Sequence, residues 1–118
     1  MSDASVTIFH NPACGTSRKT LEIIRAAGIE PDVVEYLKAG WTKPQLKRLL
    51  KVMGASARDI LRVRGTPAEE LKLTDPNATE DQILDAMVGH PILVERPIVE
   101  TAKGAALCRP QEKVHDLL

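Results

Sequence analysis

The sequence is poor in aromatic residues and has no net charge, and each of these features excludes a class of function. Aromatic residues make up 3% of the 118 residues, which is too few for a surface that stacks nucleic-acid bases. Lysine and arginine together number 16, as do aspartate and glutamate. No long-range field therefore attracts DNA, RNA or an anionic membrane, and an anion that binds this chain needs a local site.

Long apolar runs and linker segments are also absent from the sequence. No stretch approaches the roughly 18 apolar residues of a membrane helix, and residues 1–5 lack the apolar run of a secretory signal. We therefore expect a cytoplasmic protein. The length, a hydrophobic content of 43% and the lack of repeats or Gly/Ser linkers predict one domain over residues 1–118.

Only two cysteines occur, Cys14 and Cys108, and they lie far apart without CxxC spacing or a set of histidines near them. This pattern argues against a disulfide framework and against a zinc site, and we expect both thiols to be reduced. Cys108 follows the apolar run 105–107 and is interpreted as a core residue, with a resolving thiol as the alternative.

Cys14 lies between an alternating run, residues 6–9, and a segment with an apolar stripe at Leu21, Ile24 and Ala27. The pattern predicts that Cys14 sits where a strand turns into a helix. Backbone N–H groups at a helix start have no intrahelical partner and carry the positive end of the helix dipole, so they favour a thiolate. The thiolate is the nucleophilic form, although many single cysteines are inert and buried.

Several neighbours of Cys14 can support a nucleophile. His10 and Arg18 are basic, Ser17 carries a hydroxyl, and Gly15 lets a ligand approach the backbone. The alternative for His10 is a strand-end residue that hydrogen-bonds the backbone and is mostly neutral at pH 7.

The remaining segments predict an α/β fold. Residues 32–36 are typical of a strand, and capping signals at Thr42, Thr66 and Thr79 predict a helical insertion at about 42–88. Two antiparallel strands are expected over 91–94 and 97–101, and a last helix over 111–117. The order β-α-β, helical insertion, β-β-α is that of a thioredoxin/glutaredoxin-like mixed sheet.

Three arginines lie at junctions between expected elements. Arg96 precedes Pro97, Arg109 precedes Pro110, and Arg62 follows a turn. A planar guanidinium suits tetrahedral oxyanions, whereas most surface arginines are simply solvated.

Three separate blocks of the sequence, residues 10–18, 90–99 and 107–110, closely resemble the glutathione/glutaredoxin-coupled arsenate reductases. The resemblance covers essentially the whole chain. It implies a thioredoxin-like fold, a Cys14 nucleophile assisted by His10 and Ser17, and a cis peptide at Arg96-Pro97. It also implies an oxyanion pocket that consists of Arg62, Arg96 and Arg109.

The implied reaction is attack of Cys14 on arsenate, after which glutathione and a glutaredoxin complete reduction to arsenite. Glutathione is then a co-substrate, and no bound cofactor or metal is expected. One alternative is a redox-responsive transcription regulator of the Spx type, which binds RNA polymerase and usually carries CxxC, whereas position 17 here is Ser. A phosphatase-like reductase needs Arg six positions after Cys, and position 20 is Thr. A thioredoxin-like protein without arsenate activity is the last alternative.

Overall fold

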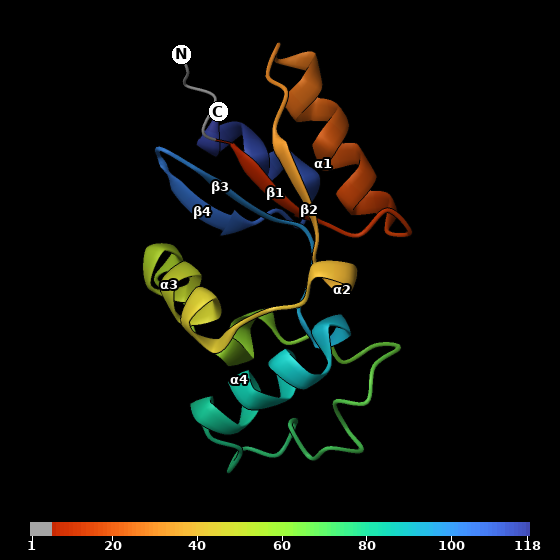
Figure 1. Ribbon diagram of the computed structural model, residues 1–118, viewed down its shortest axis with the longest axis vertical. Helices are drawn as coiled ribbons and strands as arrows, with labels where there is room; N and C mark the ends of the chain where they lie inside the picture. The colour runs from red at the N-terminus through yellow and green to blue at the C-terminus, as the bar shows by residue number, and fades with distance from the viewer. Residues whose placement is uncertain (1–5) are drawn as a thin grey trace. The chain divides into compact units, whose positions relative to one another are not determined.

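The computed structural model describes residues 6–118, which form two compact units (Figure 1). Of these residues, one unit consists of 6–39 together with Arg96–Leu118, and the other is Gly40–Glu95. The second unit contains the region in which the sequence predicts a helical insertion.

A four-stranded sheet forms the centre of the first unit, in the order β2-β1-β3-β4. The strands are β1 (Thr7–His10), β2 (Asp32–Glu35), β3 (Ile98–Thr101) and β4 (Gly104–Leu107). Strand β1 runs parallel to β2 and antiparallel to β3, which in turn is antiparallel to β4. The expected mixed sheet of the α/β class is therefore confirmed.

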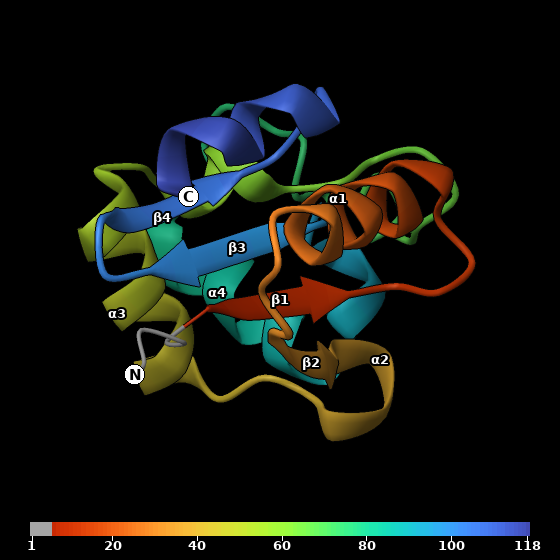
Figure 2. The same cartoon turned by 90° about the horizontal axis from the view of Figure 1, so that it is seen from above.

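Two helices pack together against this sheet, α1 (Gly15–Ala26) and the 3₁₀ helix η3 (Gln111–Leu117). Figure 2 shows them side by side on the same side of the strands. Ile8 and Val99 from the sheet meet Ile24 of α1 and Val114 of η3 in one apolar cluster. Burial of these side chains is what joins the helices to the sheet.

The hairpin next to β1 differs from the expected one. A strand over 91–94 is wrong, because residues Pro91–Leu93 form a 3₁₀ helix, η2. Its backbone is satisfied locally by bonds from Leu93 N to His90 O and from Val94 N to Pro91 O. Strand β3 pairs instead with β4, which the sequence analysis did not identify as a strand, and Gly104 begins β4 at a φ of 143° that favours glycine.

The second unit contains α3 (Lys43–Met53) and α4 (Glu80–Gly89). Both begin with the capping box that the sequence predicts, Thr42 with Gln45 and Thr79 with Gln82. Each of these threonine side chains accepts a hydrogen bond from the backbone N–H three residues later, which satisfies a donor that has no partner inside the helix. The short α2 (Tyr36–Ala39) belongs to the first unit, and η1 (Ala57–Ile60) to the second.

The third capping signal does not begin a regular helix. The Thr66 hydroxyl donates to carbonyls that precede it, those of Arg62 and Val63. One bond between Leu71 N and Pro67 O is of helical type, but residues 64–77 form turns and bends. Pro76, which has no N–H, stands within the segment. The expected insertion is therefore helical mainly at its two ends.

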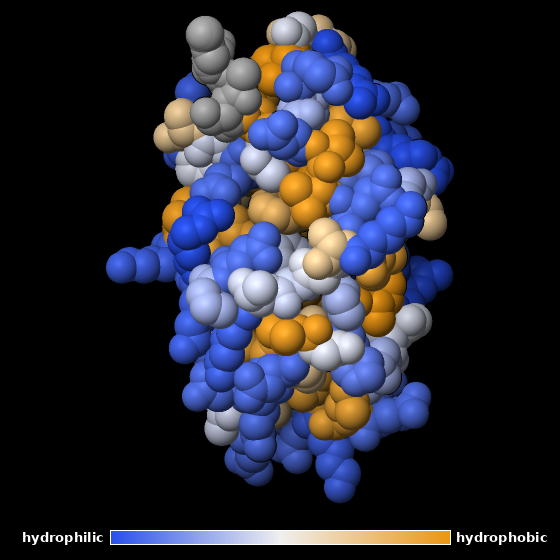
Figure 3. All heavy atoms as spheres, in the orientation of Figure 1, coloured by the Kyte–Doolittle hydropathy of each residue, from blue (hydrophilic) through white to orange (hydrophobic). Residues whose placement is uncertain are grey.

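The surface mixes apolar and hydrophilic side chains. In the face seen in Figure 3, hydrophobic residues come to the surface as separate patches with hydrophilic ones between them. Large apolar side chains that are exposed include Leu37 in the first unit and Val52 in the second. Among the described residues, no helix combines the length and apolarity needed to cross a membrane.

Replacement of Ile24 by Ala tests the packing of α1. Ile24 is 0% exposed, so the variant should lower the free energy of unfolding by about 2–5 kcal/mol in urea denaturation. Leu37→Ala is the matched control, because Leu37 is 42% exposed and its truncation should cost much less. Equal losses for the two variants would contradict the assigned core.

Candidate active site

The loop that carries Cys14 is held by Asn11. Strand β1 ends at His10 and α1 begins at Gly15, with Cys14 at the N-cap in extended conformation. The Asn11 side-chain oxygen accepts a hydrogen bond from Ala13 N at 2.9 Å, and the Asn11 backbone carbonyl accepts one from Cys14 N at 3.0 Å. The thiol therefore stands at the start of a helix, where the sequence places it.

The sheet register brings two arginines to the same edge as the end of β1. Phe9 in β1 pairs with Ile98 in β3, and Ile98 pairs with Leu107 in β4. Arg96 lies just before β3 and Arg109 just after β4. The end of β1, the start of β3 and the end of β4 therefore lie next to one another. Both arginines precede proline through a cis peptide bond, which confirms the expectation at Arg96-Pro97 and adds a second at Arg109-Pro110.

Arg109 reaches the sulfur directly. Its Nη1 donates to Cys14 Sγ at 3.6 Å and to the carbonyl oxygen of Arg96 at 2.8 Å. The second bond fixes the guanidinium against the backbone. A cation is thus held next to a partly exposed thiol.

These contacts make Cys14 acidic. Burial raises the pKa of the thiol, but the Ser17 backbone N–H and the guanidinium groups of Arg96 and Arg109 more than offset this effect. The result is a pKa of about 7, below the ordinary value of 9.0. A large fraction of Cys14 is therefore thiolate near neutral pH.

Arg96 also presents buried donors. Its Nε and Nη1 are buried, and within residues 6–118 they have no hydrogen-bond partner. Buried N–H groups of this kind are costly unless an acceptor meets them. They lie on the same side chain that lowers the pKa of Cys14, so an anion bound beside the sulfur is a suitable acceptor.

His10 and Ser17 form a buried pair under the loop. His10 Nδ1 and Ser17 Oγ are 2.6 Å apart, and Ser17 Oγ also accepts from Asn11 N at 3.1 Å. Burial lowers the pKa of His10, as do the charges of Arg25 and Arg18, while Glu35 raises it. A neutral His10 therefore braces Ser17, whose backbone N–H is the part of the residue that stabilises the thiolate.

Arg62 belongs to the other unit. Its Nη1 forms an ion pair with Glu95 Oε1 at 2.7 Å, and its Nε donates to the Arg64 carbonyl at 3.1 Å. These two contacts hold the guanidinium within its own unit. Its membership of an oxyanion pocket stays a prediction.

Cys108 has the opposite environment to Cys14. It is 0% exposed within the apolar cluster around Ile24. Burial raises its pKa to about 12, despite the charge of Lys113. The interpretation as a core residue agrees with this environment, because a protonated buried thiol is inert.

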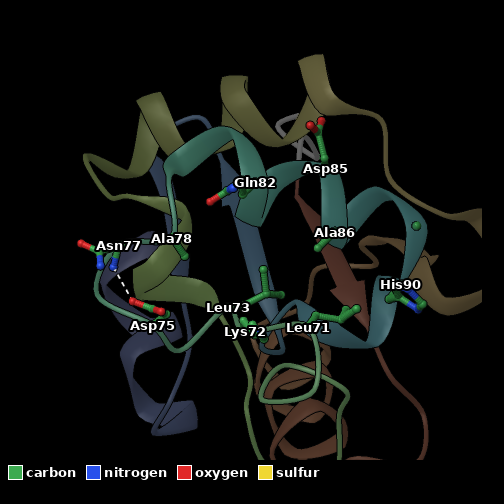
Figure 4. Close-up of a pocket in the computed structure, with 11 residues that line it drawn as sticks. Leu71, Lys72, Leu73, Asp75, Asn77, Ala78, Gln82, Asp85, Ala86 and His90 are labelled. Atoms are coloured by element: carbon green, nitrogen blue, oxygen red, sulfur yellow. Dashed lines mark hydrogen bonds between the residues drawn. The ribbon is translucent and has the colours of Figure 1, made fainter.

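A separate hollow of about 690 Å³ lies in the second unit, Gly40–Glu95, and none of the predicted site residues lines it. Figure 4 shows it along α4, with Gln82 and Ala86 of the helix opposite Leu71 and Leu73.

Across residues 6–118, His, Cys, Asp and Glu side chains form no group of three or more that could hold a metal ion.

Asn11 is the residue of this site that the sequence analysis did not identify. It is buried, with 3% of its surface exposed. An Asn before Pro at the end of a strand is a signal for a side-chain-to-backbone turn, and this signal could have identified it.

Comparison with known proteins places this geometry in a family. The family model described as the ArsC family matches residues 9–117. The chain belongs to the ArsC family. A curated relative, arsenate reductase ArsI1 of Synechocystis sp., is 54% identical over all of this chain and 82% of its own length. An arsenate reductase of Escherichia coli is 50% identical over 98% of this chain and 82% of its own.

Solved structures agree with this assignment. The arsenate reductase from Vibrio cholerae matches with a TM-score of 0.92 and 39% identity, over 97% of this chain and 98% of that one. The ArsC chain therefore has the thioredoxin-like fold that the order of its elements predicts.

The acidity of Cys14 can be measured by alkylation. The rate of iodoacetamide modification against pH should have its midpoint near a pH of about 7, with Cys14→Ser as the blank. Arg109→Ala should move the midpoint toward higher pH, because loss of the cation destabilises the thiolate. Arg25→Ala, an exposed charge later on α1, should leave it unchanged. An identical midpoint in the native and Arg109→Ala proteins would contradict the assignment.

Proposed function

We propose that this ArsC-family chain is an arsenate reductase with Cys14 as its nucleophile. The observation that carries the proposal is that Cys14 is half-buried and its thiol has a pKa of about 7, with a guanidinium nitrogen 3.6 Å from the sulfur. Relatives named as arsenate reductases that are about half identical over nearly the whole chain support the same activity.

The first step is displacement at arsenic. The Cys14 thiolate forms a sulfur–arsenic bond, and one arsenic–oxygen bond breaks as that oxygen takes up protons and leaves as water. Arg96 and Arg109 neutralise the oxyanion, both as it binds and as charge shifts in the transition state. Without them, a thiolate and an arsenate anion would repel each other.

Arg62 completes the proposed oxyanion site as a third guanidinium. The proposal for Arg62 rests on the resemblance of the whole chain to the arsenate reductases, which is carried by residues 10–18, 90–99 and 107–110. Its guanidinium is held by Glu95 and by the Arg64 carbonyl, so it is ordered in advance of substrate.

We further propose that glutathione and a glutaredoxin supply the remaining reducing equivalents. Reduction of arsenate to arsenite takes two electrons, which equal one disulfide formed from two thiols. Cys14 supplies one thiol, and Cys108 is buried with a raised pKa, so a thiol from outside the chain fits the second role. A cytoplasmic location belongs with this proposal, because glutathione keeps thiols reduced there.

A disulfide-switch regulator is less well supported. Position 17 is Ser, and its side chain is engaged with His10 and with the backbone of Asn11. The position at which a CxxC motif would have its second cysteine is therefore occupied by a serine whose hydrogen bonds hold the loop in place.

Arsenite formation with purified components tests the proposal. The native protein should convert arsenate when glutathione and glutaredoxin are present, and thioredoxin alone should not replace them. Cys14→Ser should lose activity altogether while its circular dichroism stays native, because the nucleophile is gone. Equal turnover by Cys14→Ser would remove Cys14 from the mechanism, and equal support by thioredoxin would contradict the proposed donor.

Replacement of the three proposed oxyanion-binding arginines should lower kcat/KM for arsenate, whereas replacement of a surface arginine should not. Arg96→Ala and Arg109→Ala should each lower kcat/KM for arsenate by about 100-fold, the size expected for loss of a charged donor to an oxyanion. Arg62→Ala should lower it in the same direction. Arg25→Ala serves as a charge control, since Arg25 pairs with Glu30 on the surface. If Arg62→Ala, Arg96→Ala and Arg109→Ala all kept the native kcat/KM, the assignment of an oxyanion pocket to these arginines would be contradicted.

A further inference from the structure

We propose that Glu95 is the positioning residue for Arg62, and that it holds the guanidinium in the orientation in which arsenate meets it. The inference rests on the proposed function, which places Arg62 at the oxyanion. Neither the sequence pattern nor the relatives' names single out Glu95.

The contact between the two side chains is short and sheltered. Nη1 of Arg62 donates to Oε1 of Glu95 at 2.7 Å, and the side chains are only 18% and 22% exposed. Charge-assisted bonds of this length are among the stronger hydrogen bonds in proteins, and partial burial limits their screening by solvent. Other ion pairs of the same unit, such as Lys43 with Asp85, have a more exposed acidic partner.

The backbone fixes both partners of this pair. Arg62 N donates to Leu93 O at 2.7 Å, and Glu95 N donates to Ile60 O at 2.8 Å. These bonds flank the bridge between Leu61 and Val94. The pair is therefore set by a two-stranded contact and not by two freely rotating side chains.

The remaining contacts of Arg62 leave donors for a ligand. Its carbonyl accepts from the Thr66 hydroxyl at 2.7 Å, and its Nε donates to Arg64 O at 3.1 Å. A guanidinium has five N–H groups, and the bonds to Glu95 and Arg64 use two of them. Glu95 thus orients the planar group through one edge, and further N–H groups can meet an oxyanion.

The position of Glu95 in the chain suits this role. The next residue is Arg96, which lowers the pKa of Cys14. The stretch from Leu93 to Arg96 therefore holds Arg62 by backbone and side chain and also supplies one of the arginines that act on the nucleophile.

An opposite role for Glu95 makes a different prediction. If its carboxylate competed with arsenate for Arg62, removal of the negative charge would improve arsenate binding. If it orients Arg62, loss of the acceptor weakens binding, whereas an amide of the same length preserves it. The sign of the change in KM therefore decides between the two.

Steady-state arsenate reduction by Glu95→Ala and Glu95→Gln tests the inference. Glu95→Ala should raise KM for arsenate by about tenfold with a smaller change in kcat, because the Arg62 guanidinium loses the contact that orients it toward arsenate. Glu95→Gln keeps an oxygen acceptor at the same place and should stay within about twofold of the native KM. In an Arg62→Met background, Glu95→Ala should add no further effect.

Glu80→Ala is the matched structural control. Glu80 is a carboxylate of the same unit that accepts from Ala57 N at 3.0 Å, so its loss should lower the Tm without raising KM. A native KM in Glu95→Ala, or a lowered KM in both Glu95 variants, would overturn the role of Glu95. If Arg62→Met itself keeps the native KM, the oxyanion assignment of Arg62 fails and the inference fails with it. If the native protein forms no arsenite with any thiol donor, the proposed function fails first.

Discussion

A negative sulfur beside fixed cations is the interaction on which the rest of the account depends. Cys14 is acidic because the Ser17 N–H, Arg96 and Arg109 together outweigh the cost of burial. Each comes from a different part of the chain, and the sheet register brings them together. Pairing of Phe9 with Ile98, and of Ile98 with Leu107, is thus a requirement of the site as much as of the fold.

The two units carry different parts of the proposed chemistry. The first unit, which holds the sheet, contains the nucleophile and the two arginines that act on it, whereas the second unit contains Arg62 and Glu95. In each unit an arginine is fixed by an oxygen acceptor, the Arg96 carbonyl for Arg109 and the Glu95 carboxylate for Arg62. Orientation of guanidinium groups before substrate binds reduces the reorganisation needed in the transition state.

The sequence correctly predicted the features that depend on interactions between residues close together in the chain. The strand-to-helix turn at Cys14 and the capping boxes at Thr42 and Thr79 depend on residues a few positions apart. Residues 91–94 and the signal at Thr66 were misinterpreted, because local i to i+3 bonds and a turn-rich segment replaced the expected elements. The partners of the ion pair between Arg62 and Glu95 are 33 positions apart in the sequence, so no short-range sequence pattern predicts this contact.

The most direct test is a ¹³C NMR titration of the Cys14 Cβ in the intact protein, because it reports ionisation of this one sulfur without any substrate. The account predicts a single transition near a pH of about 7 that moves to higher pH when both Arg96 and Arg109 are replaced by Met. A transition at the ordinary thiol pKa of 9.0 in the native protein would contradict the account. So would a transition whose midpoint stays the same when Arg96 and Arg109 are both replaced.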